Sequence, residues 1–446
     1  MNPAVRAAAI NVKITEASEV YKQASEESRG WNETEVELVT DSGKSFSGMC
    51  DRDGVAPILN LTGTVTEVKV RRRGPCATPI TWTVASQPPA ADFKPGAEVA
   101  VAIHARLRNS VWTSGSGMFN DTGALRSDVI SDLAGTVDDL SMLETFFMKG
   151  NGPEVGFDPR FLKGKPDEAD KTALCKQLID ACHAAGLQLL CGYEGVAEGG
   201  KNSPQAESFK EFLRKATITQ SEAHAAAIHE KIFVELGLDF DGVGFDIETV
   251  GVNTFDEQFE ALFGTLAKLL AADNRILTYA SATFAKDGET SKEAAHMRSQ
   301  RYSLARLAPN IIVRPMGYDG GHVYNEQTKT GLHKEGIDCA LRDVGLHPSQ
   351  FQMGVKLVGF LLSGGKQKVG ISQPFDGNTV RKRIDDLYRP NRIGLISFAI
   401  GGPSEPTSAQ MRSDIKTFDP HLNPKGPKAG TVGSPLQCPR RTENLR

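Results

Sequence analysis

The pattern of hydrophobic and polar positions divides the chain into two parts. In residues 1–94, short segments alternate between hydrophobic and polar side chains and are separated by turns that contain Gly, Pro or Asp. A period of two is typical of strands with one buried face. We therefore expect a small antiparallel β-rich domain over 1–94. Its expected strands cover 34–39, 44–50, 65–71 and 80–85.

Strand-like and helix-like segments alternate from about residue 95 to residue 420. Residues 170–185 carry hydrophobic side chains at the spacing of a helix, Gly186 follows as a C-cap would, and 187–193 resembles a strand. Repeated units of this kind favour a parallel sheet. The predicted fold class is α/β, a (β/α)8 TIM barrel preceded by the small antiparallel β domain. A doubly wound open sheet is the alternative, but no G-x-G-x-x-G opens a helix here.

The two ends of the expected barrel are less regular than its middle. We expect 98–107 and 142–148 to form its first two strands, although 108–128 shows no readable pattern between them. Residues 421–446 are rich in Pro, Gly and Lys and are predicted to be disordered. The predicted domains are therefore 1–94, 95–420 and a tail.

The segment 241–248 has two contrasting faces. Because side chains alternate along a strand, its three hydrophobic residues share one face, while Asp246 and Glu248 lie on the other behind two glycines. We expect the glycines to leave space there. Cα atoms two positions apart on a strand are separated by about 7 Å, so the two carboxylates can divide acid and base roles. An exposed acidic strand end is the alternative.

Four stretches occur in a fixed order: DGVGFDIE at 241–248, MGYD at 316–319, QMGVKLVGF at 352–360 and GLISF at 394–398. In this order they resemble glycoside hydrolase family 18, the chitinase and endo-β-N-acetylglucosaminidase family. That family carries the signature Asp-Gly-x-Asp-x-Asp-x-Glu and, later, Met-x-Tyr-Asp. The resemblance covers roughly 97–420 and is strongest from 235 to 400.

The resemblance implies a retaining, substrate-assisted glycosidase that acts on β-linked N-acetylglucosamine glycans such as chitin, N-glycans or peptidoglycan. Glu248 is the expected general acid. Asp246 would orient the substrate's acetamido group, and the Tyr318 hydroxyl would hold the acetamido carbonyl. Asp319 would contact the sugar or tune the acid.

Further positions are expected to contact the substrate. Phe398 would form the apolar floor beneath the sugar, and Met316 belongs to the same motif as Tyr318 and Asp319. Tyr193, at the end of an earlier strand, is expected to line the cleft. Phe398 also has an alternative role in the core, and Tyr318 with Asp319 could form a simple turn.

Two positions depart from the family pattern. Gly244 stands where the family has a second Asp, and Phe398 stands where it usually has Trp. Without that Asp, Asp246 loses a charged neighbour, and we expect a shift in rate or pH optimum. These departures leave two other functions open. A lectin-like inactive barrel predicts sugar binding without turnover, and a scaffold or docking component predicts neither.

Composition and charge limit the kinds of partner that we expect. The chain has 446 residues, of which 39% are hydrophobic and 24% charged, as expected for a globular protein. The net charge of −4 gives no indication of a nucleic-acid or membrane-surface partner. Seven scattered cysteines contain no C-x-x-C pair. His224 and His229 would lie about 140° apart around a helix. We expect no metal and no cofactor.

The first residues, MNPAVRAAAINVKIT, contain only a four-residue apolar stretch, which is shorter than the hydrophobic region of a signal peptide. We therefore expect a protein that is cytoplasmic as made, with secretion by a non-classical route as the alternative. The N-terminal domain is expected to bind carbohydrate or to dock the protein on a toxin or secretion assembly.

Overall fold

The computed structural model describes most of the chain up to residue 418. The described residues are 9–16, 34–51, 54–72, 80–104, 109–120, 123–150, 152–162, 167–196, 204–247, 256–273, 275–282, 298–308, 310–317, 332–346, 350–356, 387–388, 393–400 and 407–418. The expected tail at 421–446 lies outside them. Within them, no helix is long and apolar enough to cross a membrane.

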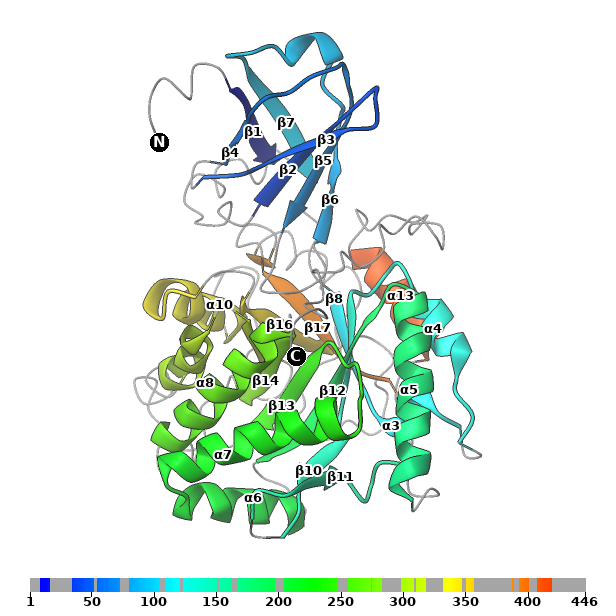
Figure 1. The fold of residues 1–446 in the computed structure, drawn as a ribbon, viewed down its shortest axis with the longest axis vertical. Helices are drawn as coiled ribbons and strands as arrows, with labels where there is room; N and C mark the ends of the chain where they lie inside the picture. Colours follow the sequence, from blue (N-terminus) through cyan, green and yellow to red (C-terminus); the bar gives the residue numbers. More distant parts are fainter. Residues whose placement is uncertain are drawn as a thin grey trace, which may run out of the picture.

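The N-terminal part is a sheet with the strand order β3-β2-β5-β6-β7-β1-β4 (Figure 1). Its pairs are antiparallel except for β1 with β7. Alternate side chains of these strands form a separate hydrophobic core. The strands are β1 (Ile10–Glu16), β2 (Thr34–Thr40), β3 (Ser45–Met49), β4 (Val55–Ile58), β5 (Val65–Arg72), β6 (Ile80–Val84) and β7 (Glu98–His104), with a short helix η1 (Ala90–Asp92).

The two edge strands of this sheet approach each other. A Cβ on Gly48 in β3 would lie 2.5 Å from the carbonyl oxygen of Pro57 in β4, so only glycine permits the contact. The sheet therefore curls around its core. Strand β7 belongs to this sheet through its pairing with β1 and β6. The prediction that 98–107 begins the barrel is wrong, because an alternating strand fits a half-buried position in either domain.

The second part is a parallel barrel. Its strands follow one another as β15-β14-β13-β12-β9-β8-β17-β16, and a bridge between Val313 and Phe351 connects the two ends. The fold is thus the predicted TIM barrel. The strands are β8 (Asn109–Thr113), β9 (Asp139–Met142), β12 (Gln188–Val196), β13 (Gly242–Ile247), β14 (Ile276–Ala282), β15 (Ile311–Met316), β16 (Gln352–Lys356) and β17 (Gly394–Ile400).

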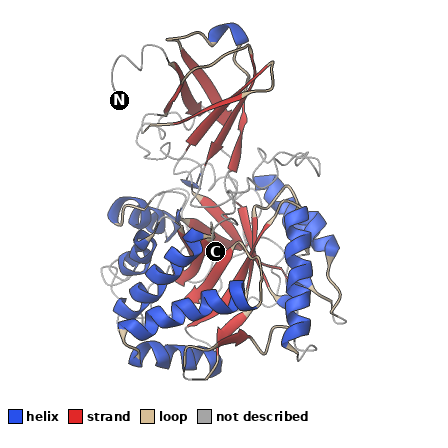
Figure 2. Ribbon diagram, viewed as in Figure 1, coloured by secondary structure: helices blue, strands red, loops and turns tan. Residues whose placement is uncertain are grey.

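Helices cover the outside of the barrel (Figure 2). Helix α7 begins at a capping box in which Thr217 and Gln220 bond to each other's backbone N–H, and Gly186, with φ of 74°, follows α5. The helices are α3 (Gly115–Met118), α4 (Ser127–Leu133), α5 (Glu168–Ala184), α6 (Pro204–Lys215), α7 (Ile218–His229), η2 (Glu230–Glu235), α8 (Asp256–Ala272), η4 (Leu304–Leu307), α10 (Leu332–Asp338), η5 (Cys339–Asp343) and α13 (Ser408–Phe418).

The first barrel strand, β8, lies in the segment 108–128, where the sequence shows no readable pattern. All five of its residues are buried, so it lacks the alternation that reveals a half-exposed strand. The expected strand 142–148 is divided between β9 and a short hairpin, in which β10 (Phe146–Met148) pairs with β11 (Val155–Phe157).

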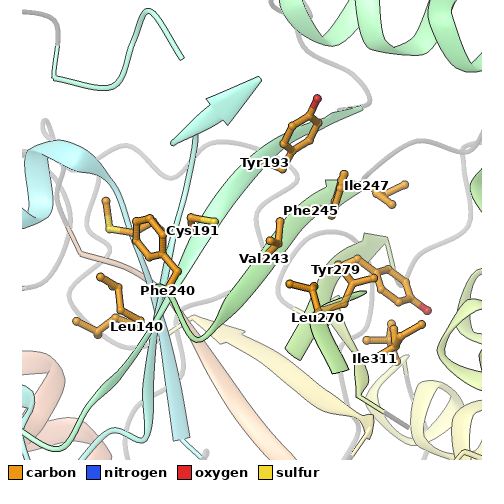
Figure 3. Packing of buried hydrophobic residues seen from close by; sticks show 14 of the residues in the cluster. Leu140, Cys191, Tyr193, Phe240, Val243, Phe245, Ile247, Leu270, Tyr279 and Ile311 are labelled. Carbon is orange, nitrogen blue, oxygen red and sulfur yellow. The ribbon is translucent and has the colours of Figure 1, made fainter. Parts of the chain in front are cut away.

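Each barrel strand has two buried faces. The large hydrophobic core contains the outward-facing residues, such as Val243, Phe245 and Ile247, together with the helices (Figure 3). The inward-facing residues form smaller groups. One of these consists of Leu190, Ile276 and Ile312.

Candidate functional site

Asp246 is placed near the carboxyl end of β13, on the face opposite Val243, Phe245 and Ile247. Since those three residues pack in the outer core, Asp246 faces the barrel interior. Its side chain is partly exposed, although one carboxylate oxygen, Oδ1, is buried. The two faces predicted for this strand are therefore confirmed. The carboxyl end of a parallel barrel is also where side chains from several strands converge.

The glycines before Asp246 do not leave open space, contrary to the expectation. A Cβ on Gly242 would lie 2.1 Å from the carbonyl oxygen of Ile276, so that position requires glycine. A Cβ on Gly244 would lie 3.0 Å from Thr278 Oγ1 and 3.2 Å from Ser141 Oγ. Two hydroxyl groups thus occupy the space in which a larger residue 244 would extend.

A small apolar cluster occupies the same end of the barrel interior. It draws on four strands and consists of Trp112, Ala280, Met316 and Ile396, with Leu143 packed against it. Ala280 pairs with Asp246 in the sheet, so the carboxylate of Asp246 lies at the border of this cluster. Trp112 and Met316 are each only 5% exposed. An aromatic surface bordered by a carboxylate is an arrangement that can bind the apolar face of a sugar ring.

Trp112 was missed by the sequence reasoning. It lies in β8, and its strand pairs with β9 and β17. The only signal in the sequence is a tryptophan near the end of a short apolar segment. That signal became meaningful only once β8 was placed in the barrel.

Several predicted site residues lie outside the described part of the chain. Glu248, Tyr318 and Asp319 are in this group. Met316 is described and lies at the end of β15, in the apolar cluster. Phe398 pairs with Lys356 in β17, but its side chain is not among those described. The structure thus brings Asp246 and Met316 to the same end of the barrel, two residues before Glu248 and Tyr318 respectively.

Tyr193 does not line the cleft. Its side chain is fully buried in the outer core, between β12 and the helices (Figure 3). The hydroxyl lies 2.8 Å from Nε2 of His224, and the ring contacts Phe209 and Phe245. The prediction is wrong because the side chain of Tyr193, like that of Cys191, points outward from β12 toward the helices and not into the barrel.

His224 has a structural role in the outer core. Its Nδ1 lies 3.1 Å from the carbonyl oxygen of Pro153, and burial lowers the pKa of His224 to about 4. The neutral ring therefore donates a hydrogen bond from Nδ1 to the carbonyl of Pro153 and accepts one from the Tyr193 hydroxyl at Nε2. Within the described residues, no group of three His, Cys, Asp or Glu side chains could hold a metal ion.

The buried cysteines are poor nucleophile candidates. Burial raises the pKa of Cys175 and of Cys182 to about 12, so these thiols stay protonated at neutral pH. Burial also raises the pKa of Cys339 to about 11. Because the thiolate is the reactive form, these residues serve packing.

No protein-family model matches this sequence, and no curated protein matches it. Among solved structures, the fold is similar to a family 18 chitinase from Pseudoalteromonas aurantia, with a TM-score of 0.45 and 12% identity, over 70% of this chain and 99% of that chain. It is also similar to the spore cortex-lytic enzyme SleL of Bacillus cereus, with a TM-score of 0.46 and 14% identity, over 81% and 91% of the two chains.

A third similar structure is an endo-β-N-acetylglucosaminidase from Cordyceps militaris, with a TM-score of 0.38 and 12% identity, over 70% of this chain and 91% of that chain.

Proposed function

We propose that this protein is a glycoside hydrolase that cleaves β-linked N-acetylglucosamine glycans, with Glu248 as the general acid. One observation carries the proposal. Asp246 faces the barrel interior at the carboxyl end of β13 and borders the cluster that contains Trp112 and Met316. The next inward position of the strand pattern is 248, and two residues after Met316 comes Tyr318.

The proposed reaction proceeds in two steps. In the first, Glu248 gives its proton to the glycosidic oxygen as the bond to the anomeric carbon breaks, while the substrate's acetamido oxygen attacks that carbon. This forms a cyclic oxazolinium ion. In the second, Glu248 removes a proton from water as the water adds to the anomeric carbon and the ring reopens. The acid is thereby restored, and the product keeps the original anomeric configuration.

Asp246 and Tyr318 would position the acetamido group in this reaction. The Asp246 carboxylate would accept a hydrogen bond from the acetamido N–H, and its negative charge would stabilise the oxazolinium ion. The Tyr318 hydroxyl would hold the carbonyl oxygen against the anomeric carbon. Because Asp246 borders apolar side chains, its charge is screened less than in water.

The rest of the site would select the sugar. Met316, Phe398 and Trp112 would form the apolar surface under the ring, and Asp319 would contact its hydroxyl groups. Chitin, an N-glycan core and peptidoglycan are the candidate substrates. We further propose that the N-terminal β domain binds carbohydrate or docks the protein on a toxin or secretion assembly.

The test compares the wild-type protein with Glu248→Gln on N-acetylglucosamine oligomers, an N-glycan and peptidoglycan. Glu257→Gln is the matched control, because it makes the same chemical change at an exposed position of α8. We expect turnover in the wild type and in the control, and a loss of at least about 100-fold in Glu248→Gln, the usual scale of general acid catalysis.

NMR of the first product formed should show the β-anomer, as retention requires. If the wild type, Glu248→Gln and Glu257→Gln all bind the glycans without turnover, the protein is a lectin and the proposal is wrong. If they neither bind nor cleave them, the scaffold function remains.

A further inference from the structure

A buried histidine holds the peptide that follows Met316. The His333 side chain on α10 is not exposed to solvent, and its Nε2 lies 2.7 Å from the carbonyl oxygen of Gly317. Its Nδ1 is hydrogen-bonded to the hydroxyl of Tyr388, which is also fully buried. Since a carbonyl oxygen can only accept, Nε2 carries the proton, and in the neutral ring Nδ1 accepts a hydrogen bond from the Tyr388 hydroxyl.

Gly317 is also enclosed by its other neighbours. A Cβ at this position would lie 2.6 Å from His333 Nε2, 2.6 Å from the sulfur of Met353 and 2.8 Å from the carbonyl oxygen of Gly354. The Gly317 peptide is therefore packed against both α10 and β16. It is the link between the apolar cluster, which ends at Met316, and residue 318.

We propose that His333 is a positioning residue of the active site, acting through the Gly317 carbonyl on Met316 in the apolar cluster. This inference rests on the proposed function. A donor fixed at the Gly317 carbonyl holds the carboxyl end of β15, and with it the Met316 side chain in the apolar cluster. Displacement of a positioning group by about 1 Å can cost roughly 100-fold in rate.

Tyr388 completes the arrangement. The hydrogen bond that its hydroxyl donates to Nδ1 fixes the ring in the tautomer that carries a proton on Nε2. Tyr388 comes shortly before β17 in the chain. Its carbonyl oxygen accepts a hydrogen bond from the backbone N–H of Ile393, next to that strand, at 3.1 Å. The histidine thus connects the end of β15 to the residues that precede β17.

The chain contains a matched control. His224 likewise joins a buried tyrosine hydroxyl, that of Tyr193, to a backbone carbonyl, that of Pro153. Both histidines are fully buried. The His224 arrangement lies in the outer core and ends at the β10–β11 hairpin, so replacing it should reduce stability without moving the Gly317 peptide.

The experiment measures kcat, KM and the unfolding temperature Tm for His333→Phe, His333→Gln, Tyr388→Phe and His224→Phe, on the oligomer that the wild type cleaves best. Phe keeps the ring volume but removes the donor. Gln can place an amide N–H near the same carbonyl. We expect kcat to fall by about 10- to 100-fold in His333→Phe, with partial recovery in His333→Gln and a smaller loss in Tyr388→Phe.

His224→Phe should lower Tm about as much as His333→Phe does, and its kcat should equal that of the wild type. If His333→Phe and Tyr388→Phe both keep the wild-type kcat while folded, the inference is overturned. If His333→Phe does not fold, a wild-type kcat in Tyr388→Phe and His333→Gln overturns it equally. An inactive wild type contradicts the proposed function itself, and the role inferred for His333 falls with it.

Discussion

Arg314 and Asp139 form an ion pair inside the barrel, with 2.9 Å between the guanidinium nitrogen and the carboxylate oxygen. Neither side chain is more than 1% exposed. The Ser110 hydroxyl donates to Asp139 at 2.5 Å, and Arg314 Nε donates to the side-chain oxygen of Gln352 at 2.7 Å. The pair therefore joins β8, β9, β15 and β16 across the interior.

Removing one member of this pair should destabilise the barrel strongly. We expect Arg314→Met to lose about 3–5 kcal/mol of unfolding free energy, because it leaves the Asp139 carboxylate buried without its countercharge. Urea denaturation of the wild type and the variant checks this. The double variant Arg314→Met with Asp139→Leu should recover much of the loss. A loss of less than about 1 kcal/mol of unfolding free energy, the scale of a solvent-exposed pair, would contradict the prediction that this pair is shielded from water.

Trp112 should contact the bound sugar. We expect Trp112→Phe to raise KM for N-acetylglucosamine oligomers several-fold, since a smaller ring offers less surface for stacking. Phe is chosen because Trp→Ala in a buried layer costs about 3–5 kcal/mol. Steady-state kinetics and tryptophan fluorescence during titration with the oligomer measure the effect.

The control for this prediction is Trp82→Phe, in β6 of the N-terminal sheet. The part of the fluorescence change that arises in the barrel should persist in Trp82→Phe and disappear in Trp112→Phe. Unchanged KM and an unchanged fluorescence response in Trp112→Phe would show that the indole only fills the barrel.

His183 makes part of the stability dependent on pH. Its Nε2 lies 2.9 Å from Asp241, and the hydrogen bond to Asp241 raises the pKa of His183, against an opposing effect of burial. A raised pKa in the folded state means that protonation favours folding. This contribution is fully present below the unfolded-state pKa of about 6.5 and is lost as the pH rises through the folded-state pKa.

We therefore expect the difference in unfolding free energy between the wild type and His183→Gln to be largest near pH 5.5 and to shrink as the pH rises above about 6.5. Chemical denaturation at a series of pH values measures this difference. His183→Gln keeps a polar side chain at the end of α5. A difference that does not change with pH would mean that Asp241 binds the neutral ring as well as the charged one.

Local patterns predicted the parts of the site that depend on one strand. The alternation in 241–247 placed Asp246 opposite Val243, Phe245 and Ile247, and the structure confirms that arrangement. The same rule could not assign a direction to Tyr193, because both faces of β12 are buried. When neither face meets water, the hydrophobic pattern does not distinguish the barrel interior from the outer core.

Periodicities over a few residues are enough to predict the α/β class, the repeated strand-and-helix units that favour a parallel sheet, and the strand that carries Asp246. Only the tertiary structure assigned β7 to the N-terminal sheet and brought Trp112, Ala280, Met316 and Ile396 together. It also joined His333 to Gly317. These contacts depend on barrel closure and strand register, which are set by packing between segments far apart in the chain.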